Sequence, residues 1–258
     1  MRRFLRALAA EFCKMKHSGI LLVHLLVPLG GALLFLLYYQ VSPWDEADKI
    51  SGYYEVAAAA YPIMIAVVVG MSVGWEEENH FQRLLAGESR IFIFGAKFLS
   101  MFLLGLAAAA VAAGAFQAGF FLLSGGNMDD LLTGMRTGAE MSACIAAVNV
   151  SLYLIHLFLN LRFGRTASIL TGFTGSVLGM LTLTGLGEGL WQFIPYSMAG
   201  RMAGYVGLLE YGGWEGQQRL LLLEELQKAV PGICVWSLGL AIFTFVWFHR
   251  WEGHDCFE

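Results

Sequence analysis

Polar side chains recur within an otherwise apolar stretch between residues 141 and 161. They are Ser142, Asn149, Tyr153, His156 and Asn160, separated by 7, 4, 3 and 4 residues. A helix turns once in about 3.6 residues, so these side chains share roughly one face. Because polar groups facing lipid are costly, this face should point into a helix bundle or toward a second subunit. Two interpretations stay open: the face lines a path for a transported molecule, or it only hydrogen-bonds neighbouring helices.

A second group of residues is typical of protein docking rather than of catalysis. The stretch from residue 75 to residue 90 reads WEEENHFQRLLAGESR. Three acids suit the first turn of a helix, where the backbone dipole favours negative charge, and an apolar patch follows at i, i+3 and i+4. Such a short helix fits a groove on a partner, although an unpartnered loop is an alternative. The residues predicted to dock are Glu76, Glu77, Glu78, Phe81, Gln82, Leu84 and Leu85.

The sequence lacks the common motifs for ATP binding, nucleophilic catalysis and metal binding. It contains no G-x-x-x-x-G-K-[ST] loop for ATP, no G-x-S-x-G elbow and no H-E-x-x-H helix. The six histidines and four cysteines are dispersed, without the spacing of metal ligands. We therefore expect a non-catalytic chain with no metal site. Any ATP hydrolysis would belong to a separate subunit.

The elements that must hold these residues are membrane-spanning helices. Of the 258 residues, 57% are hydrophobic and only 14% are charged, and the mean hydropathy is +0.63. A soluble domain needs more charge to cover its surface, and the net charge of −4 argues against nucleic-acid binding. We predict an all-α integral membrane protein, a single domain over residues 1–258. Six spans are expected at about residues 20–39, 56–75, 98–124, 141–161, 166–186 and 230–248.

Basic residues predict the orientation of these spans. With both termini in the cytoplasm, the inner segments hold eleven of the 16 Lys and Arg residues. The positive-inside rule favours that arrangement. The outer segments then hold twelve acidic and five basic residues. This excess of acidic residues either only keeps the outer loops soluble or creates a negative field that attracts cationic ligands. The acids that we single out for cation attraction are Asp45, Glu46, Asp48, Asp129 and Asp130.

Two further segments are expected to be helical without spanning. Residues 1–18 have apolar and basic residues on different helical faces, which predicts an interfacial helix on the inner surface or a charged stop before the first span. Residues 187–229 carry aromatic residues suited to headgroup depth, including Trp191 and Tyr196. We expect a surface-lying or re-entrant extracellular segment there, with a break at Pro231-Gly232. Gly70 with Gly74, and Gly175 with Gly179, predict close helix packing.

The stretch over residues 53–97 also resembles a known family. It has a proline, Pro62, early in the second span and the acidic run Glu76–Glu78 before an F-Q-x-L-L helix, and Lys97 begins the third span. The W-x-x-x-P-Y run at 191–196 adds to the likeness. The chain resembles the permease subunits of type-2 ABC exporters (the ABC-2 class), and within them the lantibiotic-protection permeases of the MutG and MutE kind. Residue-level likeness covers about a fifth of the chain.

This resemblance implies a transport assembly in a bacterial cell membrane. A separate ATP-binding subunit, usually in two copies, would supply ATP and Mg, and a second permease of similar fold would complete the membrane part. By position, the stretch over residues 76–90 would be the coupling helix. The cargo would be a lantibiotic, a mostly cationic amphipathic peptide removed from the producer's own membrane. The residues of the possible substrate path are Asn149, Tyr153, His156, Asn160, Trp191 and Tyr196.

Two alternatives to a lantibiotic exporter stay open. In the first, the chain is a type-2 permease for another amphipathic cargo, such as a drug, lipid or glycan. In the second, it is a membrane sensor subunit that transports nothing. Substrate-stimulated ATPase activity separates the first alternative from the peptide exporter. A sensor needs no ATPase partner and would not co-purify with one.

Overall fold

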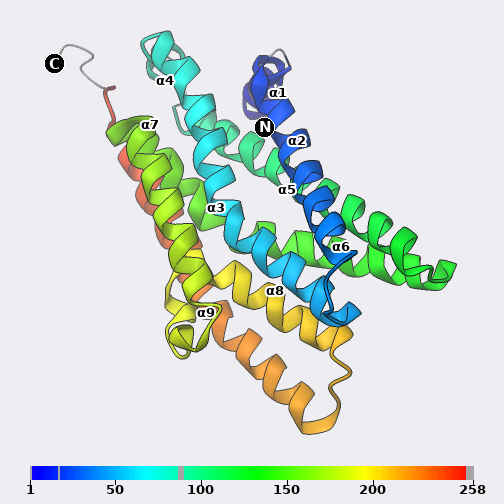
Figure 1. Cartoon of the computed structure of the whole chain (residues 1–258). Helices are drawn as coiled ribbons and strands as arrows, with labels where there is room; N and C mark the ends of the chain where they lie inside the picture. The colour runs from blue at the N-terminus through cyan, green and yellow to red at the C-terminus, as the bar shows by residue number, and fades with distance from the viewer. Residues whose placement is uncertain (1, 17, 87–89, 254–258) are drawn as a thin grey trace.

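The computed structural model describes residues 2–16, 18–86 and 90–253 (Figure 1). Residue 1, residue 17, residues 87–89 and residues 254–258 lie outside the described ranges, and so do the corresponding parts of the predicted segments 1–18 and 76–90. The described residues form α-helices, two short 3-10 helices and connecting turns, with no β-strand among them. The α-helices are α1 (Arg2–Met15), α2 (Gly19–Tyr39), α3 (Glu46–Glu78), α4 (Gln82–Ala86), α5 (Arg90–Ser124), α6 (Met128–Val148), α7 (Val150–Leu181), α8 (Pro195–Tyr211) and α9 (Gly216–Arg250).

Several of these helices have the length and hydropathy of membrane spans. In the described part of the chain, α2, α3, α5 and α9 each qualify alone, and α6 and α7 qualify together as a bent pair. Apolar side chains are exposed along them, as expected where lipid is the solvent: Leu26 and Leu34 on α2, and Val235 and Ile242 on α9, are all more than half exposed. The prediction of an all-helical, multi-pass membrane protein is confirmed.

Helix α7 folds back on itself at Gly164. This residue has φ 84° and ψ 174°, a conformation that glycine adopts without a side-chain clash. In a straight helix, His156 and Ser168 would be about 18 Å apart along the axis, yet His156 Nδ1 lies 2.8 Å from Ser168 Oγ. The two arms of α7 therefore pack side by side, and the turn lies between the predicted spans at 141–161 and 166–186.

Small residues allow α7 and α8 to approach closely. A side chain at Gly175 would meet the ring of Tyr196, and a Cβ at Gly179 would lie 2.6 Å from the Tyr196 carbonyl oxygen. Both members of this predicted G-x-x-x-G pair thus face α8. The other pair behaves differently, since a Cβ at Gly70 would lie 3.0 Å from Arg165 whereas Gly74 faces open space.

The end of the chain departs from the expected pattern at Pro231. Sequence predicted a break there, but α9 runs continuously from Gly216 to Arg250. A proline inside a helix removes one backbone hydrogen bond, and the surrounding turns keep the helix intact. The backbone at Gly232 lies very close to the short 3-10 helix Trp191–Phe193, because a Cβ added to Gly232 would meet the Gln192 carbonyl oxygen. The Pro-Gly pair therefore marks a close approach of two chain segments.

Residues 187–229 fold into short helical turns, α8 and the first part of α9. Helix α8 lies along α3, and its face toward α3 carries small residues: side chains at Gly200, Gly204 and Gly207 would each come close to α3 atoms, at Glu55 or Ser51. Nine of its 17 residues are buried. Helix α8 is therefore packed against the protein along one face.

Both described ends of the chain lie at the same end of the bundle (Figure 1). Lys14 of α1 pairs with Glu76 at the end of α3. Trp251, which follows α9, packs its ring on Phe81 with centroids 5.1 Å apart and accepts a hydrogen bond from Arg90 through its carbonyl oxygen. The α3–α5 connection thus contacts residues from both ends.

Candidate functional site

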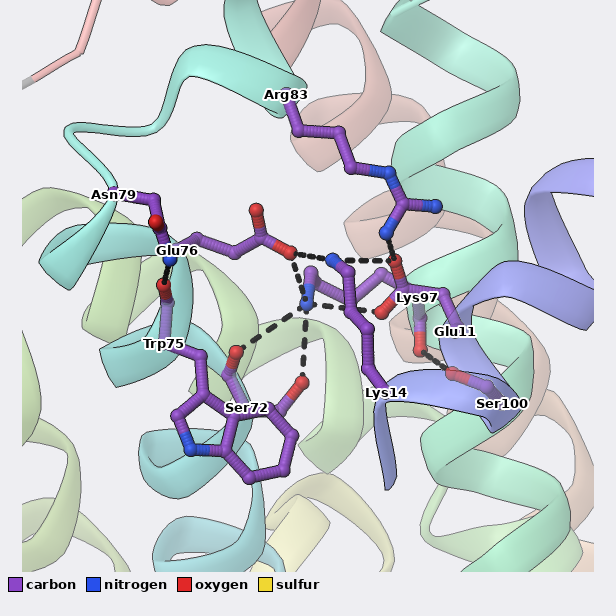
Figure 2. A network of polar contacts seen from close by, with 9 residues as sticks. All are labelled: Glu11, Lys14, Ser72, Trp75, Glu76, Asn79, Arg83, Lys97 and Ser100. Atoms are coloured by element: carbon purple, nitrogen blue, oxygen red, sulfur yellow. Dashed lines mark hydrogen bonds and ion pairs between the residues drawn. The ribbon is translucent and has the colours of Figure 1, made fainter. Parts of the chain in front are cut away.

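A buried cluster of charged side chains joins four helices at this end of the bundle (Figure 2). Glu11 and Lys14 come from α1, Glu76 from α3, Arg83 from α4 and Lys97 from α5. Glu11, Glu76 and Lys97 are each less than 5% exposed. Charges this deeply buried are stable only when they are paired and hydrogen-bonded. The cluster therefore fixes the relative positions of the four helices.

Lys97 lies at the centre of the cluster. Its Nζ is 3.1 Å from Glu11 Oε2 and 3.2 Å from Glu76 Oε1. It also donates to Ser72, at 3.1 Å to Oγ and 3.3 Å to the carbonyl oxygen. An ammonium group has only three N–H donors, so these four acceptors surround it fully. The two carboxylates and the Ser72 oxygens thus compensate for the cost of burying this charge.

The remaining two cations close the cluster on its more open side. Lys14 pairs with Glu76 and also with Glu11, at 3.2 Å. Arg83 Nη1 lies 3.1 Å from Glu11 Oε1. Glu11 therefore contacts all three cations and fastens α1 to α4 and α5. The amphipathic helix α1 is held by ionic contacts as well as by the buried side chain of Met15.

Sequence reasoning missed this cluster, although one signal was present. Glu11 is the only acid within residues 1–18, a segment that is otherwise basic. A single acid in a basic segment does not help to orient the chain in the membrane, so it points to a basic partner elsewhere in the protein. Lys97 was expected to mark the start of the third span, but α5 begins seven residues earlier, at Arg90, which places Lys97 inside the bundle.

The structure corrects the geometry expected for the docking segment. Glu76, Glu77 and Glu78 form the last turn of α3 rather than the first turn of a new helix. The chain then reverses through His80 and Phe81, which have φ values of 51° and 54°, and the Phe81 N–H donates to the Glu76 carbonyl oxygen at 2.7 Å. Non-glycine residues adopt positive φ only when the surrounding structure requires it. Among the described residues, the helix that follows is α4, Gln82–Ala86.

The apolar side chains of this segment face the protein. Phe81 is 3% exposed and packs on Trp251, and Leu84 is fully buried. Leu85 is half-buried, so the apolar patch predicted to meet a partner instead anchors the turn to its own chain. The side chains that face outward are polar: Glu77, Glu78, Asn79, His80 and Gln82. These five residues are called the exposed turn below.

The polar residues predicted along a substrate path are buried together. His156 contacts Ser168 through Nδ1 and Tyr196 Oη through Nε2, at 2.8 and 3.3 Å. Tyr153 Oη lies 3.2 Å from Tyr61 Oη. The two asparagines of this polar face use their amides locally, since Asn160 donates to the His156 carbonyl oxygen and Asn149 to that of Ile145. Ser142, the fifth residue of that face, donates to the Ala109 carbonyl oxygen of α5. Trp191 is buried against Tyr205. Tyr153 thus joins α7 to α3, and His156 joins the two arms of α7 to each other and to α8.

An apolar cavity that sequence did not predict opens among α2, α3, α5 and α6. Its volume is about 180 Å³. Alanines of α3 and α5 form much of its wall, and the tyrosines Tyr53, Tyr54 and Tyr61 border it. A run of alanines such as AAAA does not predict a cavity, because alanine is common in helices whatever they pack against.

Acidic residues predicted to attract cations meet at the other end of the bundle. Asp45, Glu46 and Asp130 line one pocket of about 530 Å³ beside Gln117 and Tyr211. Two of these acids also cap helices. Asp45 accepts from the Asp48 N–H at the start of α3, and Asp130 completes a capping box with Asn127 at the start of α6. Asp48 and Asp129, in the first turns of the same helices, are not among the residues that line the pocket.

Comparisons with protein families, curated proteins and solved structures find no match for this chain. In the ranges that the structure describes, no three His, Cys, Asp or Glu residues gather in a way that could hold a metal ion. The functional proposal therefore depends on the arrangement of the chain itself.

Proposed function

We propose that this chain is the permease subunit of a type-2 ABC exporter in a bacterial cell membrane, and that it expels a lantibiotic or similar antimicrobial peptide. It is itself non-catalytic and works with an ATP-binding subunit in two copies, where ATP and Mg bind, and with a second permease of similar fold. Both termini lie in the cytoplasm, and α1 is the interfacial helix. The protein would thereby protect the cell that makes the peptide.

One observation carries this proposal: a short polar turn is mounted rigidly on the helix bundle. The exposed turn projects from the α3–α5 connection, while Phe81 and Leu84 anchor it from below. The charged cluster ties the same connection to α1 and α5. A displacement of the turn by a docked subunit would therefore move α1, α3 and α5 together, which is what coupling of ATP hydrolysis to a membrane bundle requires.

The course of the chain supports a six-span arrangement. The fold-back of α7 at Gly164 adds a crossing to those made by α2, α3, α5, the α6–α7 pair and α9. Six crossings return the chain to its starting side, in agreement with the contacts of α1 and Trp251 at one end of the bundle. The basic residues of the sequence favour the cytoplasm for that end.

The opposite end supports a cationic peptide as cargo. The pocket lined by Asp45, Glu46 and Asp130 concentrates negative charge there, and such a field raises the local concentration of cationic ligands. The apolar cavity bordered by Tyr53 and Tyr61 favours a second candidate, a type-2 permease for an amphipathic drug, lipid or glycan, because its apolar lining suits the apolar part of such a molecule.

Peptide tolerance tests the proposed function. Deleting this subunit while keeping its ATP-binding partner is expected to lower tolerance to the peptide, and the wild-type gene should restore it. A double variant, Glu77→Lys with Glu78→Lys, reverses the charge of the exposed turn and should fail to restore tolerance. The matched control reverses Glu224 and Glu225, which lie near the start of α9 at the opposite end of the bundle from Trp251, and should restore tolerance.

Unchanged tolerance after the deletion would reject the peptide-export function. If tolerance is unchanged but reconstituted ATPase activity rises with a lipid, drug or glycan, the second candidate function stands instead. If no ATP-binding subunit co-purifies with the tagged chain, the sensor alternative is favoured.

A further inference from the structure

A pocket of about 800 Å³ opens beside the charged cluster, between the start of α2, the end of α3 and α4. Its polar side is lined by Lys14, Arg83, Gln82, Asn79 and the buried Glu76, which is paired with Lys14 and Lys97. Met71 and Trp75 of α3 line the other side, which lies deeper along the bundle because α3 runs toward this end. The pocket thus has a charged side near the end of the bundle and an apolar side farther into the bundle.

The charged side carries an excess of positive charge. The cluster contains three cations, Lys14, Arg83 and Lys97, but only two carboxylates, Glu11 and Glu76. Both carboxylates are buried and shared among the cations. Lys14 and Arg83 remain 28% and 33% exposed at the pocket. Arg83 pairs with Glu11 through Nη1, and a guanidinium group has five N–H donors in all. The unbalanced charge is therefore accessible from the pocket.

The apolar side continues directly onto the lipid-facing surface of the protein. Ser18 and Gly19, at the start of α2, line the pocket, and Ser18 caps the helix by accepting from the Ile20 N–H. From there α2 presents Leu22 and Leu26, both more than half exposed, along its outer face. A molecule bound in the pocket would have its anionic group beside Lys14 and Arg83 and its chains along α2. Free phosphate would leave the apolar side empty.

We propose that this pocket binds the phosphate-bearing headgroup of an anionic membrane phospholipid, with its acyl chains against Met71, Trp75 and the outer face of α2. A phosphate oxygen accepts charge-assisted hydrogen bonds from Arg and Lys, which balances the excess charge of the cluster. Trp75 suits the headgroup region, where an indole ring is partly apolar and partly polar. The site does not depend on the transport function proposed above.

Lipid binding to the purified full-length chain tests this site. The probes are dihexanoyl phosphatidylglycerol, dihexanoyl phosphatidylcholine and inorganic phosphate, and the readout is the rise in melting temperature with probe concentration in a neutral detergent. Phosphatidylglycerol is expected to raise the melting temperature at lower concentration than the other two. Gln82→Glu adds a negative charge to the pocket without touching the cluster and should weaken phosphatidylglycerol binding about fivefold. Gln82→Lys should strengthen it.

Lys16→Gln is the matched control, because Lys16 is exposed near the same end but does not line the pocket. Its affinity for phosphatidylglycerol should equal that of the wild type. Equal affinities in Gln82→Glu, Gln82→Lys and wild type would overturn the proposal. Equal responses to phosphatidylglycerol and inorganic phosphate would also overturn it and assign the pocket to a free anion, whereas equal responses to the two lipids would show that negative charge is not recognised.

Discussion

Replacement of Lys97 by methionine is expected to destabilise the fold more than any other single change in the charged cluster. Methionine fills much of the same space but leaves Glu11 and Glu76 buried without their central cation. Removing one partner from a buried ion pair costs up to about 3–5 kcal/mol. Lys14 and Arg83 still pair with these carboxylates, but both cations are partly exposed and cannot replace the donors that Lys97 supplies in the interior. The melting temperature of the purified protein in detergent should fall accordingly, and α1 should become accessible to trypsin at Arg6.

Two variants separate this effect from a general loss of charge. Arg136→Met removes a cation from the exposed ion pair with Glu140 and should leave the melting temperature nearly unchanged. Adding Glu11→Gln to Lys97→Met removes one of the two buried carboxylates that lost Lys97 as a partner and should recover part of the loss. A Lys97→Met protein that melts at the wild-type temperature, with α1 still protected, would show that the cluster does not hold these helices together.

Substitution of Phe81 by aspartate is expected to have a comparable effect, through the turn rather than through the cluster. The Phe81 ring is buried against Trp251. The change removes a buried aromatic ring, which costs roughly 3–5 kcal/mol, and a carboxylate at the same place adds a desolvation cost. The melting temperature should fall, and binding of an ATP-binding subunit should be lost as a consequence.

Gln82→Asp is the matched control for Phe81→Asp, because Gln82 is the next residue and its side chain is exposed. It introduces the same charge without disturbing the packing and should keep the wild-type melting temperature. A Phe81→Asp protein with unchanged stability but no binding of the partner would contradict the structure and return Phe81 to the docking surface that sequence alone predicted.

Sequence predicts the membrane class of this fold well because hydropathy is a property of composition along the chain. Stretches such as 20–39 and 56–75 are apolar enough to identify spans without knowing what surrounds them. Helical periodicity also places Tyr153, His156 and Asn160 on one face of α7. The structure buries these residues, as the cost of polar groups in lipid requires. Periodicity does not reveal the break at Asn149, where α6 and α7 meet at a bend of 43°, so the single straight span expected at 141–161 is wrong.

The site depends on contacts that periodicity cannot reveal. Glu11 and Lys97 are 86 residues apart, and nothing local relates their positions. The direction of the apolar patch was also misjudged, because the positive φ values at His80 and Phe81 reverse the chain and turn Phe81 inward. Helical spacing shows which residues share a face, but not whether that face meets a partner or the rest of the chain.

Photo-crosslinking from the exposed turn tests the central claim, docking of an ATP-binding subunit, most directly. A benzophenone amino acid would replace Glu78, which is exposed, in membranes where the chain and the ATP-binding subunit are made together. The matched control replaces Glu224, which is about 39 Å along α9 from Arg250 and so near the other end of the bundle. We expect crosslinks to the ATP-binding subunit from residue 78 and none from residue 224. If residue 78 never crosslinks to that subunit although both proteins are made, the exposed turn is not its docking site.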